Sequence, residues 1–96
     1  MSAYILAQID IHDREQYAKY VEGFRECFGR YKGRVVVADE APQLLEGQWP
    51  WTRTAVIRFD DEQEAVRWYR SDDYQAAARY RFEGATTNLV LVRGLD

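Results

Sequence analysis

The sequence predicts an α+β fold in which a four-stranded antiparallel sheet carries two helices on one face. Four runs rich in β-branched residues are separated by two amphipathic runs, and aspartates stand where the amphipathic runs begin. The resulting order is β-α-β-β-α-β within one domain, residues 1–96. A domain of this size buries roughly 60% of its unfolded surface, so it is only modestly stable alone and a partner subunit is favoured.

The first strand is expected from Ala3 to Ile11, where AYILAQIDI alternates in part and is rich in β-branched residues. Asp13 then stands as a helix N-cap, and Gln16 is placed to reach back to it as in a capping box. Large apolar side chains follow at helical spacing, at Tyr17, Val21, Phe24, Phe28 and Tyr31. These signals predict a first helix from about Arg14 to Tyr31.

The next two strands flank an aromatic loop. Gly33 ends the helix, and RVVVADE from Arg34 to Glu40 is expected as a strand because three consecutive valines crowd a helix but suit a pleated sheet. Pro42 ends this strand, and QLLEG, residues 43–47, is a candidate short edge strand. TAVIRF, from Thr54 to Phe59, is the third full strand.

The last third of the chain predicts a bent helix and a final strand. Asp60 or Asp61 caps a second helix that reaches Ser71, where the sequence SDDY supplies a fresh cap and turns the helix in a new direction. TNLVLV, residues 87–92, closes the chain as the fourth strand. This order of elements is the ferredoxin-like arrangement, with both helices on one face of the sheet.

Apolar side chains occupy both faces of the predicted strands, although helices cover only one face of such a sheet. The alternation sets Ile5, Ala7 and Ile9 against Tyr4 and Leu6, Val35 and Val37 against Val36 and Ala38, and Leu89 and Leu91 against Val90 and Val92. The simplest cover for the second face is the same face of another copy. The sequence therefore predicts a homodimer with two packed sheets.

Composition excludes several classes of function. The formal charge of −3 argues against a nucleic-acid or anionic-membrane surface, and no apolar run approaches the ~20 residues of a membrane helix. The single cysteine, Cys27, excludes a disulfide framework and a cysteine-rich zinc site, and it is expected to be a small buried hydrophobic residue. No glycine-rich phosphate loop follows any strand. We expect a cytoplasmic protein, with no targeting segment, that uses no metal or cofactor.

The stretch LLEGQWPWTR, residues 44–53, concentrates aromatic surface on the loop between the second and third strands. Pro50 stiffens the loop and biases Trp49 toward an extended backbone, so Trp49 is expected to form one wall of a ligand cleft beside the second helix and its bend. Indole surface beside Glu46 is expected to desolvate this carboxylate and make it a catalytic acid or base. A purely structural hydrogen-bonding role for Glu46 has equal weight.

Four further side chains are candidates for the same cleft. Tyr69 and Tyr74 of the second helix are expected as apolar walls that contact substrate. Arg58 alternates with buried positions in the third strand, where a guanidinium needs an anionic partner such as a ligand carboxylate. Arg79 and Arg81 could also hold an anionic ligand, but they are expected to be solvated at the surface. His12, the only histidine, is a candidate general base, although a solvated turn residue is the favoured interpretation.

Several of these segments together resemble a known bacterial family. LLEGQWP, AVIRF, EAVRWYRSDDYQ and the terminal NLVLVRG are similar to domain of unknown function 1330, in the dimeric α+β barrel superfamily. The resemblance covers nearly the whole chain, and Lys32 before a single glycine and Asp73 depart from the family pattern. It implies a ferredoxin-like subunit paired into a barrel. Wider relatives include cofactor-free monooxygenases, isomerases and dehydratases that act on small aromatic or lactone compounds.

Two classes of function remain open from the sequence. The first is a dimeric small-molecule site, either an enzyme or a binding protein. The second is a non-catalytic binding or protein-interaction module whose tryptophan loop seals the dimer. An RNA-recognition domain shares the order of elements but needs an aromatic third-strand motif, which TRTAVIRF lacks.

Overall fold

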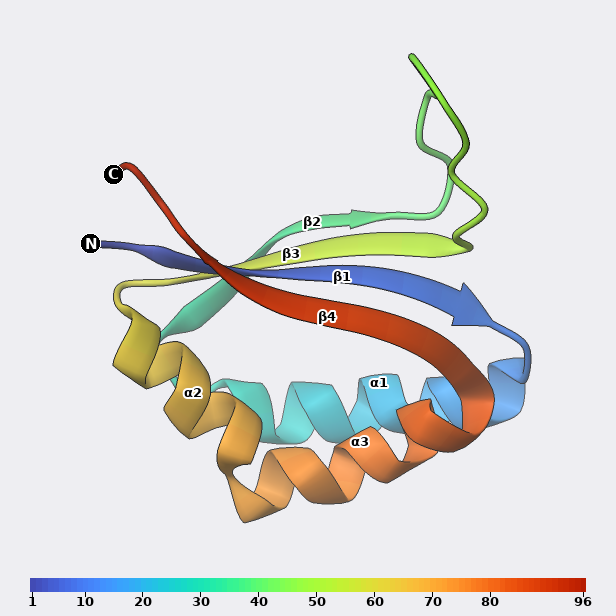
Figure 1. Ribbon diagram of the computed structural model, residues 1–96. Helices are drawn as coiled ribbons and strands as arrows, with labels where there is room; N and C mark the ends of the chain where they lie inside the picture. Colours follow the sequence, from blue (N-terminus) through green and yellow to red (C-terminus); the bar gives the residue numbers. More distant parts are fainter.

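The computed structural model describes residues 1–96 as one antiparallel sheet with three helices on a single face (Figure 1). The elements are β1 (Ala3–Ile11), α1 (Arg14–Phe28), β2 (Gly33–Asp39), β3 (Arg53–Phe59), α2 (Glu62–Arg70), α3 (Asp72–Gly84) and β4 (Ala85–Arg93). The strand order is β2-β3-β1-β4. The predicted ferredoxin-like α+β fold is therefore confirmed, and none of its helices is long and apolar enough to cross a membrane.

The predicted bend at Ser71 separates α2 from α3. Ser71 has an extended backbone, with φ −66° and ψ 149°. Its hydroxyl donates to the carbonyl oxygen of Trp68 at 2.7 Å and accepts from the backbone N–H of Tyr74 at 3.2 Å. One side chain thus serves the end of α2 and the start of α3, and the change of direction places Tyr74 against Trp68.

Two local predictions are wrong. Asp13 caps α1 by accepting from the N–H groups of Glu15 and Gln16, but the return bond from the Gln16 side chain is absent. The N–H of Asp13 already donates to the carbonyl oxygen of Gly84, so it is not free to donate to the Gln16 side chain. Residues 43–47 form no strand, because their loop extends away from the sheet and out of reach of a pairing partner (Figure 1).

The core lies between the helices and the face of the sheet that they cover, which we call the helix face. Its three largest fully buried side chains are Trp68, Tyr74 and Phe59. The rings of Trp68 and Tyr74 have centroids 4.1 Å apart, and Phe24 and Phe28 of α1 meet Trp68 edge-on. This aromatic cluster fixes the position of α2 and the start of α3 against α1.

Cys27 lies in the same core and is buried, as predicted. Burial raises the pKa of its thiol, so the thiolate form is disfavoured. The side chain therefore packs as a small hydrophobic group rather than acting as a nucleophile.

Strand β2 contains an irregularity that the sequence pattern did not reveal. Val35 pairs with Ile57 of β3, whereas Val37 pairs with Val56, so Val36 is an extra residue in β2. The alternation that grouped Val35 with Val37 is therefore wrong. After the extra residue, Ala38 faces the helices together with Val35, since both line the same cavity below α1.

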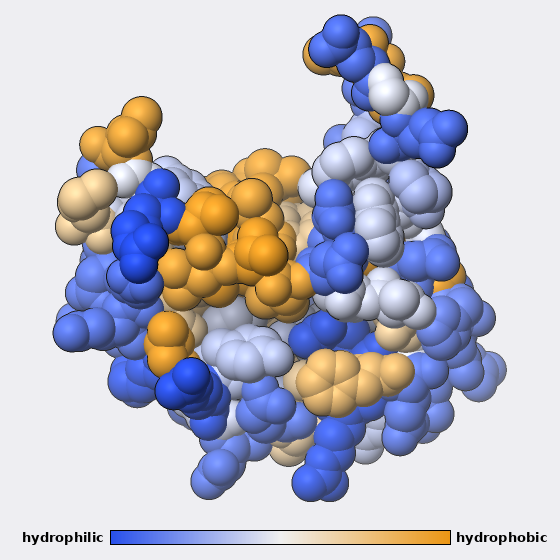
Figure 2. Space-filling model, in the orientation of Figure 1, coloured by the Kyte–Doolittle hydropathy of each residue, from blue (hydrophilic) through white to orange (hydrophobic).

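The other side of the sheet, which we call the open face, carries exposed apolar side chains in the single chain. Leu6 of β1 and Val90 and Val92 of β4 are exposed, Val90 by 53%. Figure 2 shows hydrophobic residues gathered over the sheet, between the chain termini and the β2–β3 loop. The sequence correctly predicted that this face is apolar.

Candidate functional site

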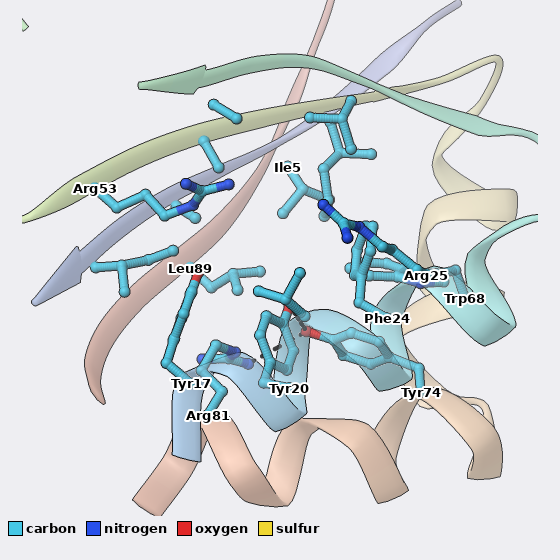
Figure 3. A pocket seen from close by; sticks show the side chains of 17 residues that line it. Ile5, Tyr17, Tyr20, Phe24, Arg25, Arg53, Trp68, Tyr74, Arg81 and Leu89 are labelled. Carbon is cyan, nitrogen blue, oxygen red and sulfur yellow. Dashed lines mark hydrogen bonds between the residues drawn. The ribbon is translucent and has the colours of Figure 1, made fainter. Parts of the chain in front are cut away.

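A cavity of about 340 Å³ lies between the helix face of the sheet and α1 (Figure 3). Its sheet wall is a row of alanines in register, in which Ala38 of β2 pairs with Ala55 of β3 and Ala55 pairs with Ala7 of β1. A methyl side chain is too short to fill the space below α1, whereas protein interiors are normally close-packed. The alanine row therefore accounts for the hollow.

The opposite wall comes from helical residues spaced so that they share one face. Tyr17, Tyr20 and Phe24 follow one another at three and four residues along α1, and Tyr74 and Arg81 lie two turns apart on α3. Fourteen of the 17 residues that line the cavity are hydrophobic. Its few polar groups can therefore fix the orientation of a bound molecule.

The polar groups of this wall form a cluster of Tyr20, Tyr74 and Arg81. The hydroxyl oxygens of Tyr20 and Tyr74 are 3.0 Å apart, and Nη2 of Arg81 donates to the Tyr74 hydroxyl at 3.4 Å. The guanidinium carbon of Arg81 lies 5.4 Å from the ring centroid of Tyr20. Figure 3 shows these side chains converging on one another beneath the sheet.

Arg81 is only 4% exposed, yet no carboxylate pairs with it, and its Nε has no hydrogen-bond partner. An arginine side chain stays protonated in proteins, and a buried charge is costly unless it is paired. Cation–π contact with Tyr20 and Phe82 offsets part of this cost. The expectation that Arg81 is solvated at the surface is wrong.

The cluster has more hydrogen-bond donors than acceptors. Burial, followed by the proximity of Tyr74, raises the pKa of Tyr20 well above its ordinary value, so this phenol stays neutral. Because Arg81 donates to Tyr74 and one phenol donates to the other, one phenolic hydrogen remains without an acceptor whichever way the pair is oriented. Together with Nε–H of Arg81, the site offers at least two unused donors.

The cavity opens between α1 and the edge formed by β2 and β3. A surface groove there shares Tyr17, Val21, Arg25 and Arg53 with the cavity lining. Glu40, just beyond β2, accepts from Arg53 at 3.1 Å and lies 3.2 Å from Arg14 of α1. Arg25 is exposed and has no ion pair, and the unpaired Glu22 and Glu26 line the same groove, so the entrance carries charges of both signs.

Of the six residues predicted for the site, only Tyr74 lines this cavity. Tyr69 packs on Tyr74 with ring centroids 5.8 Å apart and borders a separate surface depression beside β4. His12 and Glu46 are exposed at different places, one in the turn after β1 and one in the β2–β3 loop. The expected desolvation of Glu46 by indole is therefore absent in the single chain.

Trp49 and Arg58 belong to the other side of the sheet. Nε1 of Trp49 donates to the Thr54 hydroxyl at 2.9 Å, and Trp49 borders a hollow on the open face with Leu6, Val56 and Val90. The anionic partners of Arg58 are the chain's own Asp60 and Asp96, at 3.1 and 3.3 Å. The six predicted residues thus do not meet at one place in the single chain.

Sequence reasoning missed Tyr20 as a site residue, and it considered Arg81 as an anion-binding residue but favoured a solvated surface position for it. Tyr20 falls on the apolar stripe of α1, where an aromatic residue looks like ordinary core. Arg81 lies in the polar sequence RYRFE, which gives no hint of burial. A usable signal was present in the spacing of seven between Tyr74 and Arg81, which puts both on one helix face. A second signal, this time for a hollow beneath the sheet, was alanine at inward positions of three strands, at Ala7, Ala38 and Ala55.

The fold and the cavity together define an α+β protein of the ferredoxin-like class with a small-molecule-sized hollow beneath its sheet. The chain belongs to the family described as Domain of unknown function (DUF1330), which matches residues 2–95. No curated protein matches the chain.

Solved structures of similar fold include proteins with and without a stated activity. A protein of unknown function from Rhodopseudomonas palustris, RPA0582, is 19% identical with a TM-score of 0.80, covering 99% of this chain and 83% of that one. A dimeric ferredoxin-like protein of unknown function from Jannaschia sp. CCS1 is 9% identical with a TM-score of 0.73, covering 98% and 100%. SnoaB, a cofactor-independent oxygenase from Streptomyces nogalater, is 13% identical with a TM-score of 0.72, covering 99% and 94%.

Proposed function

We propose that this protein is a homodimer that binds a small organic molecule in the cavity beneath α1 and transforms it without a cofactor, as an isomerase, dehydratase or monooxygenase. One observation carries the proposal: a largely apolar cavity of about 340 Å³ has a single polar cluster, Tyr20, Tyr74 and Arg81, on one wall. Apolar pockets with a few convergent polar groups are typical of small-molecule sites.

The chemistry available inside the cavity is narrow. Its lining contains no aspartate, glutamate, histidine or cysteine. Phenol and guanidinium groups donate hydrogen bonds to negative charge that develops on an oxygen, as in an oxyanion hole. Reactions in which solvent removes the substrate proton and the site stabilises the resulting enolate therefore suit this site better than reactions that need a protein nucleophile or base. The cofactor-independent oxygenase SnoaB shares the fold, which supports the proposal only by analogy.

The homodimer is supported by the open face. Exposed apolar residues of β1 and β4 need a cover, and the same face of a second copy supplies one that is equally apolar. Trp49 borders this face. In the proposed dimer its indole contacts the partner subunit. A dimer seal by the tryptophan loop and a ligand site under α1 are compatible, because they use opposite faces of the sheet.

A non-catalytic binding module is the second candidate, and the absence of a carboxylate or imidazole from the cavity lining favours it. Enolisable aromatic ketones separate the two candidates. Exchange of the α-proton in D2O, followed by NMR, should be faster with the protein if it is an enzyme of the proposed kind. Binding of the ketone with no faster exchange supports the binding module instead.

Filling the cavity tests the location of the site. In Ala55→Leu, the larger side chain enters the hollow from the sheet, so 2-naphthol should bind at least about tenfold more weakly in calorimetry than to the wild type. Ala76→Leu makes the same change on the exposed side of α3 and serves as the control. Equal binding of 2-naphthol by both variants, with both folded, would show that the cavity is not the site.

A further inference from the structure

We infer that the molecule held in the cavity carries a single oxyanion, a carboxylate or an enolate oxygen, and that Arg81 is the residue that binds it. The inference rests on the proposed function and names the substrate class for the same site. It also gives a role to a residue that neither the fold nor the core packing requires to be charged.

Arg81 differs from the other arginines in being buried without a carboxylate partner. Six arginines form ion pairs with carboxylates, and the least exposed of their side chains still has 23% of its surface in solvent. Arg81, at 4%, is the most buried and has none. Desolvation makes an unpaired charge most costly at this position, so a structural arginine would be expected to have a carboxylate here. The missing partner points to a ligand.

The hydrogen-bond inventory agrees with an anionic acceptor. One phenolic hydrogen of the Tyr20–Tyr74 pair and Nε–H of Arg81 have no acceptor in the protein. A carboxylate or enolate oxygen brings lone pairs and no donor, so it satisfies both groups at once. A neutral hydroxyl or amide brings donors of its own and leaves the charge of Arg81 uncompensated.

The rest of the lining determines the shape and polarity of the remainder of the ligand. The other walls are mostly aliphatic and aromatic, with the alanine row on one side and Tyr17, Phe24 and Trp68 on the other. The interior holds one unpaired cation, which matches one negative charge. The ligand class is therefore a planar, largely apolar organic monoanion.

A pair of probes of equal shape tests the inference. The probes are 2-naphthoate and its neutral amide, 2-naphthamide, measured by calorimetry at pH 7.5. Charged hydrogen bonds are worth about 1.5–3 kcal/mol, so the wild type should bind the carboxylate about tenfold to a hundredfold more tightly than the amide. Arg81→Met keeps an apolar side chain of similar length and should abolish this preference.

The control is Arg79→Met, the same substitution on the exposed side of α3, which should keep the preference. If Arg81→Met does not fold, the Nε proton of Arg81 in 15N-labelled wild type gives a second readout. It should move downfield when 2-naphthoate binds and stay in place with 2-naphthamide.

Equal or tighter binding of the amide by the wild type overturns the inference while leaving the cavity as the ligand site. A preference that persists in folded Arg81→Met also overturns it. If neither probe binds at millimolar concentration and 2-naphthol does not bind either, the proposed function fails together with the inference.

Discussion

Replacing Trp49 with alanine tests whether the tryptophan loop contributes to the dimer or to ligand capture. In the single chain Trp49 is 42% exposed, and its one hydrogen bond joins Nε1 to Thr54. Truncating a fully buried tryptophan costs about 3–5 kcal/mol, so a side chain that is already half in water loses much less in the folding of one chain. Most of the cost of Trp49→Ala is therefore expected in dimerisation, where the remaining indole surface becomes buried. For an interface anchor this cost is of the order of 2 kcal/mol.

Two kcal/mol corresponds to roughly 30-fold weaker dimerisation. Sedimentation equilibrium should give twice the 11.3 kDa chain mass for the wild type and a mixture with monomer for Trp49→Ala at the same micromolar concentration. Tyr80→Ala is the control, because Tyr80 is 40% exposed but lies on α3, away from the open face. An unchanged dimer with weakened binding of 2-naphthol would refute the seal and support the cleft wall predicted from the sequence.

Two further substitutions probe the scaffold. Gly33→Ala should lower the melting temperature by several degrees, since a Cβ there lies 2.5 Å from the ring of fully buried Phe59, whereas Gly29→Ala, with nothing within 4 Å, should not. The hydrogen bonds from Arg67, aided by the Lys32 N–H, lower the pKa of Glu64 from 4.5 to about 2. The stability that the carboxylate adds is complete above about pH 4.5 and is lost toward pH 2, so the melting-temperature gap between wild type and Glu64→Gln should close over that range. A gap that stays constant with pH contradicts this assignment.

The sequence predicts the fold well because each helix and strand is marked by signals in its own short stretch of residues. Asp13, Asp61 and Ser71 are good N-caps, and each one caps a helix in the structure. The strands are short runs rich in β-branched and apolar residues, which identifies them without knowledge of their partners. Helix and strand signals of this kind act over a few residues, and they agree with one another along the chain.

The site is harder to predict because its parts are brought together only by tertiary structure. Tyr20 and Arg81 lie on different helices, and whether an arginine is buried depends on what packs over its helix. The tryptophan loop is the most unusual stretch of the sequence and was predicted to form a wall of the site. Trp49 nevertheless lies on the opposite side of the sheet from Tyr74. Which face a loop approaches is set by the path of the whole chain, and local patterns carry no information about it.

The extra residue in β2 shows how small a change decides the shape of the cavity. With regular pairing beyond Val35, Val37 would stand opposite Ala55 on the helix face and fill part of the hollow with its branched side chain. The bulge moves Val37 to the open face, where it adds apolar surface to the proposed interface, and brings Ala38 into the alanine row. One inserted residue therefore enlarges the cavity on one side of the sheet and the apolar surface on the other.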